Sequence, residues 1–188
     1  MKYRSVCIRI RISCGSHFEI NDKKNQSPLV NKIQVNLEKQ ILGYGTICHM
    51  NVVTKTIQIH SEGENDVIDI TQQLSNIVNE SNFEKGIVII FVSGSTAGIT
   101  TIEYEPGLIH DFPAMLSRIV PKNIEYKHDN TWHDGNGHSH VRASLIGPSL
   151  TIPILQGKLT LGTWQQIVIL EMDTRPRNRN VIVQVMGE

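Results

Sequence analysis

Histidines and aspartates are concentrated in residues 128–140, which hold four of the eight histidines of the chain: His128, His133, His138 and His140, beside Asp129 and Asp134. Imidazole nitrogens are common ligands of zinc. In an extended segment, His138 and His140 would project to the same side. The spacing therefore predicts that His128, His138 and His140 bind one divalent metal ion, such as zinc, and leave a fourth position open. The alternative is a solvated loop whose histidines only form hydrogen bonds.

A pair of carboxylates forms a second candidate group. Residues 99–105 alternate in polarity, so a strand there would place Glu103 and Glu105 on one face. We expect these two residues to act as general base and substrate clamp, with His128 as a third catalytic candidate. The alternative is an ordinary exposed strand face, because surface strands commonly carry carboxylates.

Two further segments could contact a phosphorylated substrate. The small-residue turn at 94–98 offers backbone N–H groups and the hydroxyls of Ser95 and Thr96, which can hold a phosphate group. Thr163 and Gln165 flank Trp164 and would contact the substrate from the opposite face of a strand. The turn matches no established nucleotide-binding fingerprint, so an ordinary tight turn remains the alternative.

Helices and strands must position these groups. Helical spacing of Ile70, Leu74, Ile77 and Val78 behind Asp69 and Thr71 predicts a first helix. Residues 87–92 are apolar on both faces, which predicts a central strand covered on each side.

The remaining pattern predicts a second helix, a loop and a group of strands. The second helix contains Leu108, Phe112 and Leu116, and Pro113 would be tolerated only near its first turn. Residues 122–140 are interpreted as a long loop. Three extended stretches, at 142–154, 158–172 and 181–186, would form an antiparallel C-terminal meander. The expected fold class is therefore α+β.

Composition divides the chain near Met50. Residues 1–49 carry eight Lys/Arg and three Asp/Glu, whereas residues 50–188 carry ten and fifteen. We interpret 1–49 as an N-terminal extension, with Met50 as an alternative translation start, and 50–188 as one domain. All three cysteines precede Met50, so the domain contains no cysteine ligand or disulfide. The domain lacks a basic footprint for nucleic acid and an apolar run that could span a membrane, so we expect a soluble cytoplasmic protein.

Several separated phrases make the domain similar to one known family. From about Met50 to Glu188 the chain resembles the YjbQ-type family of secondary thiamine-phosphate synthases, in its archaeal-style branch. The resemblance lies in 91–92 with 95–98, 126–128, 139–145, 147–153, 162–165 and 186–188.

The resemblance implies an α+β fold with a β-sandwich-like core, a homotrimer, and an activity that joins a pyrimidine pyrophosphate to a thiazole phosphate. Family members commonly carry a histidine where this chain has Gly94, and many bacterial members have proline where it has His138. We therefore hypothesise that His138 compensates for the missing histidine as a metal ligand.

Three classes of function follow from these residues. The first is the thiamine-phosphate synthase-like transferase, in which a metal ion would stabilise the departing pyrophosphate. The second is a metal-dependent hydrolase of a phosphorylated metabolite, in which the ion activates water. The third is a non-catalytic trimeric protein that binds such a metabolite.

Overall fold

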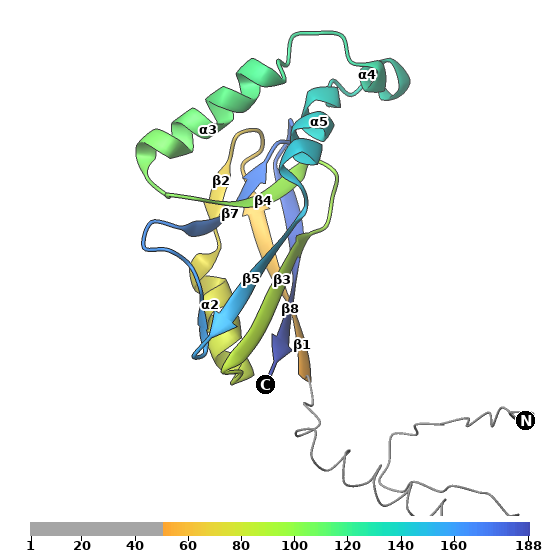
Figure 1. Ribbon diagram of the computed structural model, residues 1–188. Coiled ribbons are helices and arrows are strands. Elements are labelled where there is room, and N and C mark those ends of the chain that lie inside the picture. Colours follow the sequence, from red (N-terminus) through yellow and green to blue (C-terminus); the bar gives the residue numbers. More distant parts are fainter. Residues whose placement is uncertain (1–50) are drawn as a thin grey trace, which may run out of the picture. The chain divides into compact units, whose positions relative to one another are not determined.

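The computed structural model describes residues 51–188, so the predicted N-terminal extension lies outside the described residues. This part contains four helices and eight strands (Figure 1). In chain order they are β1 (Asn51–Ser61), β2 (Val67–Asp69), α2 (Thr71–Ser81), β3 (Lys85–Val92), β4 (Ala97–Ile102), α3 (Pro106–Ile119), α4 (Lys127–Trp132), α5 (Gly137–Ile146), β5 (Ser149–Leu155), β6 (Lys158–Leu159), β7 (Gln166–Glu171) and β8 (Arg177–Gly187).

The strands form two antiparallel sheets. One has the order β1-β8-β3-β5-β6 and the other the order β2-β7-β4. The mixed helix and sheet class is thus confirmed, but the predicted C-terminal meander is present only in its first turn, where β5 pairs with β6. β8 pairs with β1 and β3, and β7 pairs with β2 and β4, so β7 lies in a different sheet from β6 and β8. β8 buries alternate residues and β7 is buried on both faces, and neither pattern identifies the partner strand.

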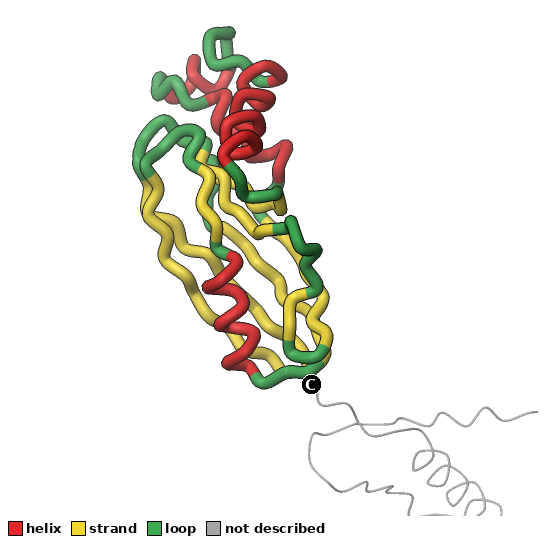
Figure 2. Tube along the Cα trace, turned by 90° about the vertical axis from the view of Figure 1, so that its left-hand side faces the viewer, coloured by secondary structure: helices red, strands yellow, loops and turns green. Residues whose placement is uncertain are grey.

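Helix α2 lies against the strands, as the spacing of its apolar residues predicts (Figure 2). Leu74 and Val78 are buried, and the Asp69 carboxylate accepts hydrogen bonds from the backbone N–H and the hydroxyl of Thr71 at the start of the helix. The core beside α2 includes Val88 and Val183 of the larger sheet, together with Ile99, Ile167 and Ile169 of the smaller sheet. Both sheets and α2 therefore share one hydrophobic core.

A second core lies between the smaller sheet and helices α3 and α5. Val168 and Leu170 of β7 pack there with Leu116 of α3 and Ala143 of α5. Pro113 is buried in the interior of α3, so the prediction that it must lie near the first turn is wrong. Ser117 donates its hydroxyl to the Pro113 carbonyl.

No helix in residues 51–188 is long and apolar enough to cross a membrane.

One face of the larger sheet is open. β3 is central, as predicted, between β8 and β5. Its predicted cover on both faces is absent within residues 51–188, because Ile87 and Phe91 are 36% and 42% exposed. Ile87 pairs with Met186 and Pro153, and Phe91 pairs with Ile182, so apolar residues of three strands lie side by side on this face.

Residues 137–146 form helix α5, which corrects the prediction of an extended segment there and the start of the next strand at Arg142. Residues 127–132 of the predicted loop form α4. Gly137 allows α5 to begin against α4, because a Cβ atom at this position would lie 2.4 Å from Cβ of Tyr126. A glycine that sequence patterning treats as a helix breaker is therefore required by a close contact between two helices.

Candidate functional site

One histidine and two aspartates converge between α4 and α5. His128, Asp129 and Asp134 each offer one ligand atom, and these atoms all lie within 4.8 Å of one another. Nε2 of His128 is buried without a hydrogen-bond partner among the described residues. Its distance to Oδ2 of Asp134 is 3.6 Å, too long for a hydrogen bond. Donors of a tetrahedral zinc ion lie about 3.4 Å apart, given ligand distances of about 2.0–2.2 Å. The 3.6 Å separation is close to this value, so the group could hold a small cation.

The backbone at the start of α5 orients both aspartates. The N–H group of Gly137 donates to Oδ1 of Asp129 at 2.8 Å, and the N–H group of Asn136 donates to Oδ1 of Asp134 at 3.2 Å. Each carboxylate therefore has one oxygen fixed by the protein. Such outer hydrogen bonds orient the ligands of metal sites.

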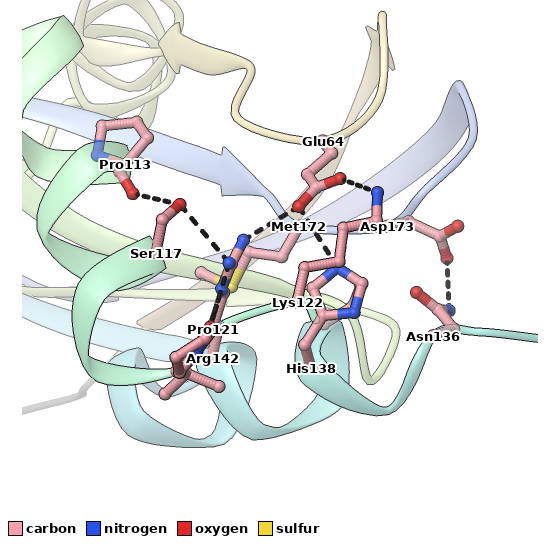
Figure 3. Close-up of polar contacts among 12 residues, drawn as sticks. Glu64, Pro113, Ser117, Pro121, Lys122, Asn136, His138, Arg142, Met172 and Asp173 are labelled. Atoms are coloured by element: carbon pink, nitrogen blue, oxygen red, sulfur yellow. Dashed lines mark hydrogen bonds and ion pairs between the residues drawn. The ribbon is translucent and has the colours of Figure 1, made fainter. Parts of the chain in front are cut away.

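The three predicted histidine ligands separate into two groups. His140 lies beside His128, with ring centroids 4.3 Å apart. His138 is buried, at 1% exposure, and its Nε2 lies 3.2 Å from Oε1 of Glu64 (Figure 3). In a helix, residues two apart point in nearly opposite directions. The predicted shared side of His138 and His140 is therefore wrong, because it assumed a strand.

Glu64, in the loop between β1 and β2, is the centre of a charged network (Figure 3). Its carboxylate accepts hydrogen bonds from Nη1 of Arg142 at 3.0 Å and from Nζ of Lys122 at 2.6 Å. Burial is the largest single effect and raises the pKa of Glu64, but the groups around it together outweigh burial, first of all the hydrogen bond and charge of Lys122. The charges of His138 and Arg142 add to this effect, so the pKa lies below its ordinary value of 4.5.

Arg142 and His138 are the buried partners of Glu64. Arg142 is only 1% exposed and also donates Nε and Nη2 to the carbonyl of Val120, just after α3. Burial lowers the pKa of His138, and Glu64 opposes this shift only in part, since Arg142 and Lys122 lower the pKa further. His138 is therefore neutral near pH 7. The network joins α5 to α3 and to the loop after β1.

A second buried network begins at the end of β7. Arg179 donates Nε to Oε2 of Glu171 at 2.7 Å and Nη2 to the Thr96 hydroxyl at 2.7 Å. The Thr96 hydroxyl donates to Oδ2 of Asp173, which lies 3.4 Å from Nδ2 of Asn136. This chain of contacts ends at the residue preceding α5. Thr96, expected to bind phosphate, therefore uses its hydroxyl inside the protein, whereas Ser95 is exposed.

The two predicted carboxylates do not share a strand face. β4 ends at Ile102, before Glu103. Glu105 is the N-cap of α3, and its carboxylate accepts the backbone N–H groups of Gly107 and Leu108. Helix capping explains this residue without a substrate. Glu103 is exposed.

The segment at 163–165 lies at the other end of β4 from Thr96. Nε2 of Gln165 donates to the Thr101 hydroxyl at 3.0 Å, and Thr163 is exposed. Thr101 is five residues beyond Thr96, a separation of roughly 16 Å along a strand. Thr163 and Gln165 are therefore far from the turn that contains Ser95 and Thr96.

Sequence patterning assigned no site role to several residues of this region: Glu64, Asp129, Asp134, Asn136, Arg142 and Asp173. Asp129 and Asp134 stood out beside the histidines but were not included among the predicted ligands, although carboxylates ligate the same ions. Glu64 is more than seventy residues from its partners His138 and Arg142. Glu64 meets these two residues only in the folded chain, where the loop after β1 lies beside α5.

Residues 51–188 form an α+β domain with two antiparallel sheets. The histidine–carboxylate cluster lies between helices α4 and α5. A family model described as UPF0047 protein YjbQ-like matches residues 55–188. A UPF0047 protein of Methanothermobacter thermautotrophicus is 37% identical over 139 residues, which cover 74% of this chain and 95% of the relative. One from Methanocaldococcus jannaschii is 39% identical over 132 residues, covering 70% and 92%.

Solved structures agree with this assignment. A YbjQ-like protein of unknown function from Sulfolobus solfataricus has a TM-score of 0.70 and 35% identity, covering 74% of this chain and all of its own. A YjbQ/UPF0047 protein from Clostridium acetobutylicum has a TM-score of 0.61 and 36% identity, covering 71% and 98%. The chain therefore belongs to the UPF0047 family of YjbQ-like proteins.

Replacement of Glu64 by glutamine should destabilise the fold and change its acid sensitivity. Loss of the carboxylate leaves the buried Arg142 without its charge partner, so we expect a loss of about 3 kcal/mol in the free energy of unfolding at pH 7. A folded-state pKa below 4.5 means that the Glu64 carboxylate stabilises the protein above that pH and that this contribution is lost as the pH falls through the folded-state pKa. Denaturant unfolding in chelator at pH 3–7 measures both effects.

The matched control is Glu80→Gln, which removes an exposed carboxylate 3.8 Å from Lys55. A change of less than about 0.5 kcal/mol is expected there. If Glu64→Gln and the wild-type protein lose stability in parallel below pH 4.5, the charge of Glu64 has no such role.

Proposed function

We propose that this chain is a metal-assisted enzyme acting on a pyrophosphorylated metabolite, and specifically a thiamine-phosphate synthase-like transferase. The observation that carries the proposal is the convergence of His128, Asp129 and Asp134 around an unpartnered imidazole nitrogen. The specific substrates, a pyrimidine pyrophosphate and a thiazole phosphate, are supported by the family resemblance of the whole domain.

The residues of the cluster suit this reaction. His128, Asp129 and Asp134 would hold a divalent cation, which when bound would neutralise charge on a departing pyrophosphate. The backbone donors at Asn136 and Gly137 keep both carboxylates oriented. His140, beside His128, is placed to contact substrate or to exchange a proton with it.

A coupling assay tests the proposal. Purified protein with a divalent metal should convert the pyrimidine pyrophosphate and thiazole phosphate into thiamine phosphate and pyrophosphate, detected by chromatography. His128→Ala should lower the rate by at least about a hundredfold, whereas His133→Ala, which changes an exposed residue at the end of α4, should not. Release of phosphate from generic phosphoesters without coupling would identify a hydrolase instead, and neither reaction would favour a non-catalytic binding protein.

Metal binding can be measured without activity. After exchange into metal-free buffer, zinc titration should show affinities reduced by about a hundredfold or more in His128→Ala and Asp134→Asn, because each removes one of few ligands. His133→Ala should retain wild-type affinity. Equal affinities of His128→Ala and His133→Ala would rule out a cation at this cluster.

The same titration decides the role of His138. Its contact with Glu64 favours a structural role, so His138→Ala should lower the melting temperature and keep zinc affinity near that of the wild type. A fall in affinity equal to that of His128→Ala would instead support the hypothesis that His138 is a ligand.

We also propose that the open face of the larger sheet is covered by other copies of the chain in a homotrimer. Support comes from the row of apolar residues on that face and from the family resemblance. Contiguous exposed apolar patches usually mark interaction surfaces. The edges of this sheet, β1 and β6, would also gain protection in a closed assembly.

Solution mass tests the assembly. The wild-type chain should have three times its monomer mass of 21.2 kDa, measured by light scattering at micromolar concentration. Phe91→Glu should dissociate it, because closing the interface would bury an unpaired carboxylate in each copy. Gln73→Glu, on the exposed side of α2, should leave the mass unchanged. A monomeric wild-type protein would contradict the proposal.

A further inference from the structure

A buried arginine lies directly beneath an exposed turn. The turn at residues 93–95, between β3 and β4, is exposed, whereas Arg179 of β8 is buried. Gly94 has a φ of +134°, and a Cβ atom built on it would lie 2.6 Å from Nη1 of Arg179. The missing side chain therefore lets the guanidinium approach the turn.

The hydrogen bonds of Arg179 leave one edge of the guanidinium unused. Nε and Nη2 donate to the carboxylate of Glu171, and Nη2 also donates to Thr96. Nη1 has no acceptor within residues 51–188, although it carries two N–H donors. The adjacent backbone N–H groups of Gly94 and Ser95 likewise have no backbone acceptor in that range, whereas Ser93 donates to the Asn180 carbonyl. Arg179 and the turn beside it therefore both have donors without acceptors in that range.

Both buried carboxylates near Arg179 already have a cationic partner. Glu171 pairs with Arg179, and Asp173 pairs with Arg177, with 2.9 Å between Nη2 of Arg177 and Oδ2 of Asp173. Their negative charges are therefore compensated within the protein and leave less repulsion for an anion at the turn.

We propose that Nη1 of Arg179 and the backbone N–H groups of Gly94 and Ser95 form a subsite for a phosphate group of the substrate. The inference rests on the proposed function and names a second, metal-independent anchor for the same phosphorylated molecule. Asp173 connects the two places, because it accepts from Thr96 beside the turn and contacts Asn136 beside Asp134. An arginine edge with backbone donors is a common arrangement for binding a phosphate group.

Inorganic phosphate is a direct probe of the subsite. In chelator-treated, ¹⁵N-labelled wild-type protein, added phosphate should shift the amide resonances of Gly94 and Ser95 saturably. Gly94→Ala should weaken phosphate binding by at least about tenfold, because the new methyl group displaces Nη1 and strains the turn. Gly157→Ala is the matched control, since Gly157 also has a positive φ, +70°, but lies in the turn between β5 and β6.

Each outcome separates this subsite from the proposed cation site of His128, Asp129 and Asp134, called the cation cluster below. Wild-type amides that do not respond to phosphate would overturn the inference, and that measurement does not depend on any variant folding. Phosphate binding that needs added metal, or that disappears in His128→Ala, would also overturn it, because the cation cluster would then be the anchor. Saturable shifts at the turn without coupling activity would uphold the subsite and refute the proposed transferase.

Discussion

The pairing of buried charges is the constraint on which the described structure depends. Arg142, Arg179, Glu171 and Asp173 are all buried, and a buried charge without a partner costs several kcal/mol. Arg142 reaches Glu64, 78 residues away in the loop after β1, whereas Arg179 reaches Glu171, eight residues away across the turn between β7 and β8. The positions of the loops after β1 and β7 therefore follow from charge compensation as much as from apolar packing.

Charge compensation also determines which face of α5 is available for chemistry. Asn136, His138 and Arg142 hold the helix against Asp173 and Glu64. His140 points to the other side, toward His128 on α4. One face of the helix is thus structural, and the opposite face borders His128, Asp129 and Asp134. Loss of a structural contact would move these three residues without changing any of them.

The elements predicted correctly are those in which local pattern and tertiary packing agree. The spacing of Leu74 and Val78 predicts α2, and the apolar run of β3 predicts a central strand. The predictions fail where a distant contact decides the outcome. Gly137 begins a helix because it packs against Tyr126, and Pro113 remains inside α3 because burial outweighs one lost hydrogen bond. Neither contact has a signature in the local sequence.

The change from strand to helix at residue 137 alters the chemistry expected at the site. Two histidines on one side of a strand would give a neutral, nitrogen-rich set of ligands that favours zinc. The helix removes His138 from that set, and Asp129 and Asp134 add two negative charges beside His128. Carboxylate oxygens also suit harder cations such as magnesium and manganese. Two carboxylates would neutralise most of the charge of a divalent ion, so a substrate phosphate would need a further positive group. Arg179 is a buried cation whose guanidinium lies beside the turn at Gly94.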